Sequence, residues 1–407
     1  MKILVQKFGG SSLTTEDCRM RAITHIKKAL AEGYALVVVV SAMGRKGDPY
    51  ATDTLLQLIK QNGDALNPRE HDMLLHTGEI ISACVMSSML GAEGIESTIL
   101  TGGQANIVTT DDFNNAQIQH IDPSRIKEEL SQGRVVIVPG FQGRTDNWEI
   151  TTLGRGGSDT SATALGVALQ AEIVDIFTDV DGIMTADPRI VEEAQPLSTV
   201  TYTEICNMAH LGAKVIHPRA VEIAMQGNVP IRVRSTFTEE PGTLVTSLHE
   251  AGKVMDAVRD RLVMGIAHVP NITQIKVFAK EGQYDTQLQV FKAMANNGIS
   301  VDFINVNPLG VAYTVHDHMA QKAAKILTDM EYEPQLLPHC AKVSVIGAGI
   351  AGVPGVMAQI VEALTSQDIQ ILQSADSHTT IWVLVHAKDM VNAVRALHQQ
   401  FALHLTR

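Results

Sequence analysis

The sequence predicts an α/β fold built around a mainly parallel sheet. Three aliphatic runs, at residues 36–40, 135–139 and 173–179, have the continuous hydrophobicity of strands that are buried on both faces. Glycine-containing turns and helical patterns follow strands of this kind, as they do in βαβ units. The last third of the chain repeats itself, which predicts two further small units of α+β structure.

Composition narrows the class of protein. The chain has 407 residues, of which 45% are hydrophobic and 4% aromatic, and it is long enough for two or three globular domains. A net charge of −12 argues against a general nucleic-acid-binding surface, because binding a phosphate backbone requires clustered Lys and Arg.

Cysteine usage and hydropathy indicate the compartment. The four cysteines are far apart and form no CxxC pair, so we expect buried thiols in a reducing compartment and no zinc or other protein-bound metal. No apolar run approaches the ~20 residues that cross a bilayer. We therefore expect a cytoplasmic protein with neither a membrane nor a nucleic acid as its partner.

The chain opens with a strand, a glycine turn and a helix. Residues 2–12 (KILVQKFGGSS) are typical of a short buried strand before Gly-Gly, and a helix is expected from about Thr15, with Thr14 or Thr15 as its cap. Lys7 stands at the end of this strand, from where a lysine can reach a terminal phosphate. The Walker phosphate loop is absent from the sequence, so a nucleotide would bind by another device.

The run at 36–40 leads into Ser41-Ala-Met-Gly44, a second loop at the carboxyl end of a strand. This edge of an open α/β sheet is where ligands bind. A polar stretch at 45–54 then precedes a helix expected from about Asp53. Thr52 and Asp53 either cap this helix or offer a hydroxyl and a carboxylate to a small substrate.

Residues 68–89 have the pattern of one apolar helix that carries Glu79. A carboxylate on such a helix is costly unless it is paired, so Glu79 either faces solvent or meets a cation such as an ammonium group. His71 and His76 are five residues apart, which does not stack two imidazoles on one helical face, and we interpret both as structural.

Residues 153–168 (LGRGGSDTSATALGVA) combine a glycine-rich turn with an apolar helix. Ser158, Asp159 and Thr160 are favoured capping types, and the free amides of a helix start attract phosphate or carboxylate. Arg155 adds a planar donor fork, and Asp159 supplies a charge that holds a lysine or magnesium. By itself, the stretch is also compatible with an ordinary capped helix.

A last group of polar residues follows the strand at 173–179. The Asp-x-Asp-Gly sequence there lacks most of a calcium loop, so a ribose and purine subsite with Thr178 and Asp179 as anchors is the better interpretation. Arg189 and Lys214 join Lys7 as cations suited to a triphosphate. The alternative is that these three cations are scattered surface charges.

Six motifs in order carry a family resemblance: KFGGSS from Lys7, SAMG from Ser41, TGE ending at Glu79, GRGGSD from Gly154, TDVDGIMTADPR from Thr178 and GAKVIHP from Gly212. Together they resemble the aspartokinases, which are ATP:L-aspartate phosphotransferases of the amino-acid kinase fold. The resemblance covers nearly the whole chain. It implies an αβα sandwich with a mainly parallel sheet at 1–245, followed by two regulatory ACT domains at 262–335 and 340–407.

The same resemblance implies the activity and its residues. The reaction would phosphorylate the β-carboxylate of L-aspartate, the first step toward diaminopimelate, lysine, threonine and methionine, with ATP and Mg2+. Glu79 would hold the amino group of aspartate, Arg155 a carboxylate, and Asp159 would orient Lys7. The implied aspartate site is Thr52, Glu79, Arg155, Gly156 and Gly157. The implied ATP site is Lys7, Phe8, Gly9, Gly10, Ser41, Ser158, Thr178, Asp179, Arg189, Lys214 and Val215.

The C-terminal third supports regulation independently. Similar segments start at positions 291 and 361, 298 and 368, and 312 and 382, and each pair differs by 70 residues. Each copy is expected to run strand, helix, strand, strand, helix, with a short strand at 262–268 completing one of them. Such modules resemble ACT domains, which associate edge to edge and bind amino acids, so we expect a homodimer or higher oligomer.

The second copy contains a GxGxxG match at 347–352, which is the dinucleotide fingerprint. Too little chain follows for the sheet that this fingerprint serves, so the duplication explains it better, with residues 352–355 as the helix-initiating effector loop. The same shortness predicts that the homoserine dehydrogenase fused to some family members is missing.

Three departures from the family pattern bear on its properties. Residues 269–274 stand where an Asp-x-Pro-Gly type effector loop is expected, Met184 replaces a tyrosine, and the loop after Met43 is longer than usual. Diaminopimelate or lysine is the expected effector, as in the lysine-sensitive bacterial type. Two alternatives remain: another amino-acid kinase acting on glutamate, acetylglutamate or a nucleoside monophosphate, and a noncatalytic amino-acid sensor.

Overall fold

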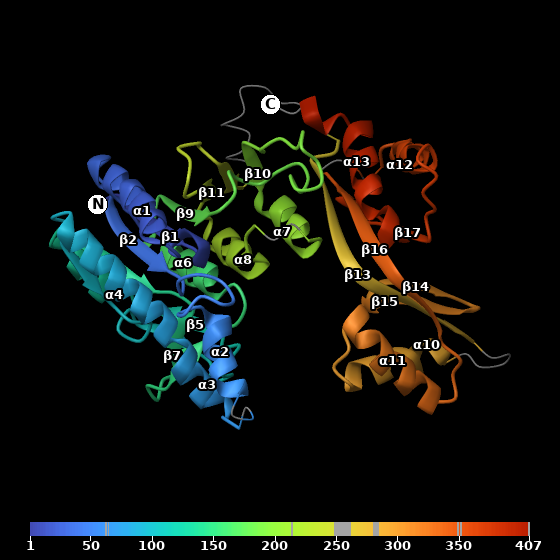
Figure 1. Cartoon of the computed structure of the whole chain (residues 1–407), viewed down its shortest axis with the longest axis horizontal. Coiled ribbons are helices and arrows are strands. Elements are labelled where there is room, and N and C mark those ends of the chain that lie inside the picture. The colour runs from blue at the N-terminus through green and yellow to red at the C-terminus, as the bar shows by residue number, and fades with distance from the viewer. Residues whose placement is uncertain are drawn as a thin grey trace.

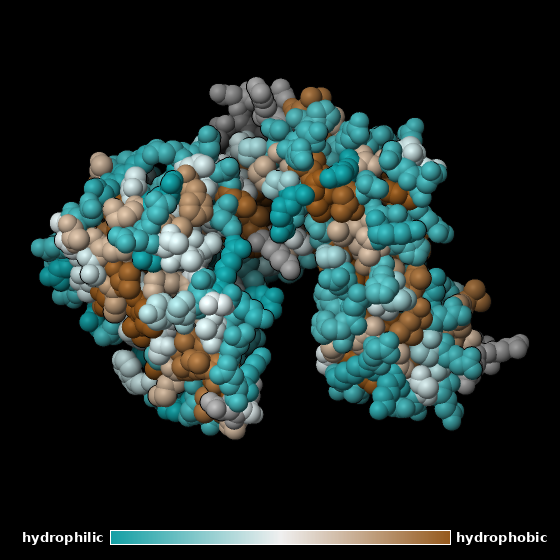
Figure 2. All heavy atoms as spheres, viewed as in Figure 1, coloured by the Kyte–Doolittle hydropathy of each residue, from teal (hydrophilic) through white to brown (hydrophobic). Residues whose placement is uncertain are grey.

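A computed structural model describes residues 1–61, 63, 65–212, 215–247, 262–279, 285–347, 350 and 352–405. Figure 1 shows an N-terminal part, in blue to yellow-green, and a C-terminal part, in orange and red. The two parts join at the top of the view. On the face drawn in Figure 2 an open hollow separates them below that junction.

The N-terminal part is organised around an eight-stranded sheet in the order β10-β12-β11-β9-β1-β2-β6-β3. Among its described pairs, only β11 and β12 run antiparallel. The central strands are buried aliphatic runs, as expected for a sheet covered on both faces. The strands are β1 Ile3–Phe8, β2 Ala35–Val40, β3 Ser97–Ile99, β6 Val135–Pro139, β9 Ile173–Thr178, β10 Thr199–Thr201, β11 Ile231–Ser235 and β12 Thr243–Thr246.

Helices cover both faces of this sheet, which confirms the expected αβα sandwich. Alternate residues of β1 and β2 face opposite ways, so Leu4 and Leu36 pack in the core with α1 and α4, whereas Val5 and Val37 pack in the core with α5, α6, α7 and α8. Thr15 caps α1 by accepting the amide of Cys18, as the sequence predicted. The helices are α1 Glu16–Ala31, α4 Thr77–Ala92, α5 Ser124–Ser131, α6 Gly157–Leu169, α7 Tyr202–His210 and α8 Pro218–Gly227.

A small second sheet was not predicted; two short helices precede it, and the first of them confirms the helix expected from about Asp53. The sheet has the order β5-β4-β7-β8, and its strands have three or four residues each, too few to show a hydrophobic period. Its strands are β4 Ile107–Thr109, β5 Ile118–Ile121, β7 Gln142–Arg144 and β8 Ile150–Thr152. The helices are α2 Thr52–Lys60 and α3 Pro68–Leu75.

The single helix predicted at 68–89 is two helices, because α3 ends at Leu75 and α4 begins at Thr77. The carbonyl of His76 at this break accepts the side-chain amide of Gln142. By length and composition alone, the stretch 68–92 could cross a membrane. One face of α4, including Ala83 and Met86, is fully buried in the core beneath the sheet, as in a core helix of a globular domain.

The C-terminal part is one six-stranded antiparallel sheet in the order β14-β15-β13-β16-β18-β17. Each half runs strand, helix, strand, strand, helix, as the duplication predicted. The first half is β13 Gly265–Phe278, α10 Thr286–Asn296, β14 Asp302–Asn307, β15 Gly310–His316 and α11 Asp317–Asp329. The second half is β16 Gln335–Ile346, α12 Val356–Thr365, β17 Gln373–Asp376, β18 Thr380–His386 and α13 Met390–Gln400.

The structure corrects one expectation for this part and agrees with another. Residues 269–274 are not a loop: they lie inside β13, where the pairing with β16 shifts register and Asn271 has a φ of 60°. The dinucleotide alternative is excluded because β16 has only antiparallel neighbours, and that fingerprint needs a parallel βαβ unit. Positions 348, 349 and 351 of the fingerprint lie outside the described residues. Gly355 does initiate a helix, because it is the N-cap of α12.

A segment after β9 joins the two parts. Ala186, Val191 and Ala194 belong to the same hydrophobic core as Val343 and the rest of the second half of the C-terminal sheet. Thr185 Oγ1 lies 2.9 Å from Nε2 of the buried His398 on α13. Met184 packs against this core as well. The residue that replaces the family's tyrosine is thus part of the junction.

Candidate active site

Four neighbouring parallel strands deliver their carboxyl ends to one edge of the main sheet. β9, β1, β2 and β6 are adjacent, so the loops after Phe8, Val40, Pro139 and Thr178 start side by side. Main-chain hydrogen bonds join them: the Ser41 amide donates to the Phe8 carbonyl and the Gly44 amide to the Gly10 carbonyl. This is the edge at which open α/β sheets bind ligands.

Gly10 is required where these loops meet. It begins a short 3-10 helix, Gly10–Ser12, and a Cβ built on it would lie 2.6 Å from the Gly44 carbonyl oxygen and 2.8 Å from that of Ala42. Any larger residue would push the two loops apart. Phe8 points the other way: its ring is fully buried and stacks on Phe177 at 4.7 Å. Phe8 was predicted to contact the nucleotide, but its side chain belongs to the core.

Lys7 and Asp159 meet at the centre of this edge. The ammonium nitrogen of Lys7, on β1, lies 2.7 Å from Oδ1 of Asp159, in the first turn of α6, and both side chains are largely shielded from solvent. An ion pair with little solvent exposure is weakly screened and fixes the direction of the lysine. The predicted role of Asp159 in orienting Lys7 is consistent with this contact.

The start of α6 differs in detail from the prediction. Its N-cap is Gly156 in the left-handed conformation, with a φ of 69°, and no side chain caps it. Ser158, Asp159 and Thr160 therefore lie inside the first turn instead of capping it. A Cβ at Gly156 would lie 2.2 Å from Cγ of His217, so only glycine fits here. Gly157 is the first helical residue, and Arg155 is exposed just before the turn.

His217 was not predicted as a site residue. It precedes α8, and the nearby charges that act on its pKa include Asp159 and Arg155, which places it beside the pair and the arginine loop. Burial lowers the pKa of His217 below its ordinary value, so its imidazole is neutral near pH 7. Its contact with Gly156 spans distant parts of the sequence, and no local pattern points to it.

Glu79 is the most strongly perturbed acid of this region. It is 3% exposed, one carboxylate oxygen accepts the Ala42 amide at 3.2 Å, and the other has no hydrogen-bond partner among the described residues. Burial raises the pKa of the Glu79 carboxyl to about 8, although the Ala42 amide lowers it in part. The solvent-facing alternative for Glu79 is therefore wrong, and the free oxygen can accept a hydrogen bond from an incoming ammonium group.

Thr52 lies two residues after Tyr50, whose carbonyl is close to Gly78 in the turn before Glu79. It is the first residue of α2, whose N-cap is Ala51, and no side chain caps this helix. The capping alternative for Thr52 and Asp53 is therefore wrong. The loop before Thr52 crosses the helix turn that leads to Glu79, since a Cβ at Gly78 would lie 3.2 Å from the Tyr50 carbonyl oxygen.

The predicted nucleotide residues are partly assembled. The hydroxyl of Thr178 donates to Asp179 at 3.2 Å, at the end of β9. Asp179 forms an ion pair with Arg45, a residue of the loop after β2 that was not predicted as part of the site. Arg189 is paired with Asp187 and points largely into solvent, although it is close enough to Asp179 for that carboxylate to raise its pKa. Lys214 lies outside the described residues, and Val215 packs against the core.

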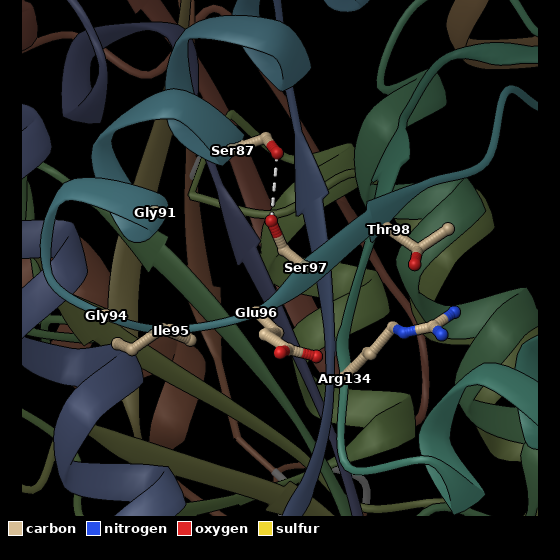
Figure 3. A pocket seen from close by; sticks show the side chains of 8 residues that line it. All are labelled: Ser87, Gly91, Gly94, Ile95, Glu96, Ser97, Thr98 and Arg134. Carbon is tan, nitrogen blue, oxygen red and sulfur yellow. Dashed lines mark hydrogen bonds between the residues drawn. The ribbon is translucent and has the colours of Figure 1, made fainter.

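A pocket of the N-terminal part lies elsewhere (Figure 3). It has a volume of about 540 Å³ and sits where α4 ends and β3 and β6 begin, at the opposite edge of the sheet. The hydroxyls of Ser87 and Ser97, 2.9 Å apart, lie on its wall, and Arg134 is already paired with Glu129. No predicted site residue lines it, so the chemistry of the loops after β1, β2 and β9 does not use it.

Comparison with known proteins identifies the family. Residues 2–235 match the amino acid kinase family and residues 335–399 an ACT domain. Aspartokinase 1 of Bacillus subtilis is 59% identical over 99% of this chain and 100% of its own length. An aspartokinase of Geobacillus stearothermophilus is 40% identical over 99% and 98% of the two chains.

Solved structures agree at the level of the fold. Aspartokinase III of Escherichia coli, in complex with aspartate and ADP, superposes with a TM-score of 0.78 at 24% identity, over 98% of this chain and 99% of that chain. Aspartate kinase of Clostridium acetobutylicum gives a TM-score of 0.78 at 22% identity, over 98% and 100% of the two chains. The chain therefore belongs to the amino acid kinase family and, within it, to the aspartokinases.

Proposed function

We propose that this protein transfers the γ-phosphoryl group of ATP to the β-carboxylate of L-aspartate, forming 4-phospho-L-aspartate, under feedback control by an amino acid. The observation that carries the proposal is the shielded Lys7–Asp159 pair at the start of α6, on the same edge as the buried Glu79. The E. coli relative of the same fold was solved with aspartate and ADP, which supports this pair of substrates.

The residues suit a reaction between two anions. The β-carboxylate has a pKa of about 4 when free, so it is ionised near pH 7 and needs no general base. The enzyme must hold this carboxylate in line with ATP and neutralise the charge that spreads over the transferring phosphoryl group. Lys7 supplies a fixed cation, and the backbone at Gly9 lies close to it, since a Cβ built there would lie 3.4 Å from Nζ of Lys7.

The aspartate would be held by its charged ends. Glu79 offers the ammonium group a buried oxygen that has no hydrogen-bond partner among the described residues. Arg155 is exposed at the turn before α6, where its planar guanidinium can bind a carboxylate with two hydrogen bonds. Gly156, Gly157 and Thr52 would complete this side of the site, as the resemblance implies for the aspartate subsite.

The nucleotide would lie over the ends of β1 and β9. Thr178 and Asp179 suit the ribose, and Ser41, Ser158, Arg189, Lys214 and Val215 remain predicted contacts. Mg2+ usually binds with the nucleotide through the phosphates and one or two carboxylates, so Asp159 and Asp179 are the candidates to assist it. The ion would supply further neutralisation of the phosphate charge.

Regulation, assembly and location are part of the same proposal. We infer that 262–335 and 340–407 are ACT domains that bind diaminopimelate or lysine, that they pair two or more chains, and that the enzyme is cytoplasmic. One relative, E. coli aspartokinase III, was also solved with lysine and aspartate, at a TM-score of 0.75 and 24% identity. This supports lysine as the first effector to test.

One assay tests the proposal against its alternatives. ADP release is measured with ATP and Mg2+ in the presence of aspartate, glutamate, acetylglutamate or UMP, and then with aspartate plus each candidate effector. We expect release with aspartate alone among these acceptors and inhibition by lysine or diaminopimelate. Preference for another acceptor would indicate a different amino-acid kinase, and no release with any acceptor would indicate a sensor.

A further inference from the structure

A buried carboxylate and a half-buried guanidinium hold the backbone that leads into the turn at 153–157, the arginine turn. Asp72 lies on α3, and Arg219 is the second residue of α8, so they come from helices that are far apart in the sequence. We propose that Asp72 and Arg219 are positioning residues that fix the turn at 153–157 and thereby aim Arg155 at the substrate carboxylate. This inference rests on the proposed function, because it assigns that carboxylate to Arg155.

Asp72 binds main-chain amides from two separate segments. Its side chain is fully buried, and its two oxygens accept the Asn114 amide at 3.0 Å each. The same carboxylate accepts the amide of Thr152 at 2.8 Å and the hydroxyl of Thr152 at 2.5 Å. These bonds satisfy a carboxylate whose transfer from water would otherwise be costly.

Arg219 donates hydrogen bonds to carbonyls of the same segments whose amides donate to Asp72. Its Nη1 donates to the carbonyl of Leu153 at 2.9 Å, and its Nη2 to the carbonyl of Ala116 at 2.8 Å. The two segments are also joined directly, since the Ala116 amide donates to the Thr152 carbonyl at 2.9 Å. Asp72 and Arg219 therefore hold the same pair of segments, 114–116 and 152–153, through their amides and carbonyls respectively.

Segments 114–116 and 152–153, which Asp72 and Arg219 hold, lie next to Arg155. A Cβ at Gly154 would lie 2.8 Å from the Asn115 side-chain oxygen and 3.1 Å from the Asn114 carbonyl oxygen, so segment 114–116 sits against this glycine. Arg155 follows immediately and is exposed, so its direction depends on the backbone beneath it. A shift of about 1 Å in a substrate-holding group can cost on the order of 10²-fold in rate.

The inference predicts a selective effect on aspartate. Lys7 is anchored by Asp159, and Thr178 lies at the end of β9, so neither depends on the contacts of Asp72. The Asp72→Asn variant keeps the size of the side chain but places an amide donor against main-chain donors. We expect its KM for aspartate to rise about tenfold, the change expected when one hydrogen bond to a charged group is lost, while its KM for ATP stays within about twofold.

Arg219 provides an independent arm. Arg219→Met removes both donors and should reproduce the loss, whereas Arg219→Lys keeps a charge that reaches one carbonyl and should recover part of it. Asp122→Asn is the matched control, because Asp122 also accepts a main-chain amide, that of Ser124, but does not contact segments 114–116 and 152–153. The control should leave both KM values unchanged.

The deciding measurement is a double-mutant cycle on the full chain, with KM for both substrates, kcat and the thermal midpoint recorded for each variant. In an Arg155→Ala background, Asp72→Asn should raise the KM for aspartate no further, because the group that Asp72 positions is gone. Additive losses, or equal rises in both KM values, would overturn the inference. A thermal midpoint that falls while both KM values stay unchanged would show a purely structural role.

If Asp72→Asn does not fold, Arg219→Lys and Arg219→Met provide the same comparison. Absence of aspartate-dependent ADP release by the wild type would instead refute the proposed function.

Discussion

The ammonium of Lys7 lies 2.7 Å from a carboxylate oxygen of Asp159, and the two side chains are only 12% and 13% exposed. One comes from the first strand and the other from the helix after the glycine turn, so the fold of the whole N-terminal sheet is needed to bring them together. The pair holds a cation at the strand ends where the loops after β1 and β2 meet.

Replacing Lys7 with alanine should lower kcat by at least about 10²-fold, the loss typical of removing one group that stabilises transition-state charge. The fold should persist, because the strand and helix that carry this pair are held by large hydrophobic cores on both faces of the sheet. Steady-state kinetics and circular dichroism would measure both. Lys2→Ala is the control, since Lys2 is an exposed lysine paired with Glu172 near the start of the same strand. Near-normal turnover in Lys7→Ala would remove Lys7 from the mechanism.

The buried carboxyl of Glu79 predicts a pH dependence. Its pKa of about 8 means that the free enzyme carries a proton there at neutral pH, and binding an ammonium group requires the ionised form. The KM for aspartate should therefore fall as the pH rises toward 8, while the KM for ATP should not follow. Glu79→Gln should have a higher KM for aspartate and lose this pH dependence, and a parallel pH profile in wild type and variant would contradict the assignment.

The same group should affect stability in the absence of substrate. The folded-state pKa lies above the ordinary value of 4.5, so the folded protein binds the proton more tightly and is stabilised most below that value. This stabilisation is lost as the pH rises from about 4.5 to 8. Glu79→Gln, which stays neutral, should melt above the wild type at pH 8 by about 2 °C or more, and the difference should shrink at pH 5.

Gly156 should not tolerate a side chain. Alanine there would adopt an unfavourable positive φ and place its Cβ 2.2 Å from the imidazole of His217, so the arginine turn must shift. We expect kcat/KM for aspartate to fall at least about tenfold in Gly156→Ala. Gly91→Ala is the matched control, because Gly91 is helical and a Cβ there meets nothing within 4 Å. Wild-type kinetics in both variants would show that the turn is not constrained.

Thr185 should couple the two parts of the chain. Its buried hydroxyl bonds to His398 at 2.9 Å and accepts the Gln195 amide at 2.9 Å, so Thr185→Val leaves both groups without that partner. The loss should be about 1–3 kcal/mol in urea unfolding, together with a changed concentration of effector for half-inhibition. Thr24→Val, in an exposed turn of α1, serves as control. An unchanged response to effector would assign Thr185 a structural role alone.

The long strands could be predicted because a strand that is buried on both faces is a continuous run of aliphatic residues. The run at 135–139, for example, coincides with β6. The strands of the small sheet could not be predicted, since three or four residues show no period. Residues 269–274 misled the prediction because the family pattern has a loop at this position, whereas here Pro270 and Asn271 occupy an irregularity within β13. In the site, the motifs located Lys7 and Asp159, whereas Arg45 and His217 are defined by partners far away in the chain.

The stretch at 183–196 has a further consequence for how such an enzyme can be divided. Ala186, Val191 and Ala194 are covered by side chains that come from the far end of the polypeptide. A catalytic fragment ending before residue 262 would leave this apolar surface bare, and we expect it to aggregate. The two parts of the chain are thus joined through one hydrophobic core, in which the second proposed effector domain packs directly on a segment of the catalytic part.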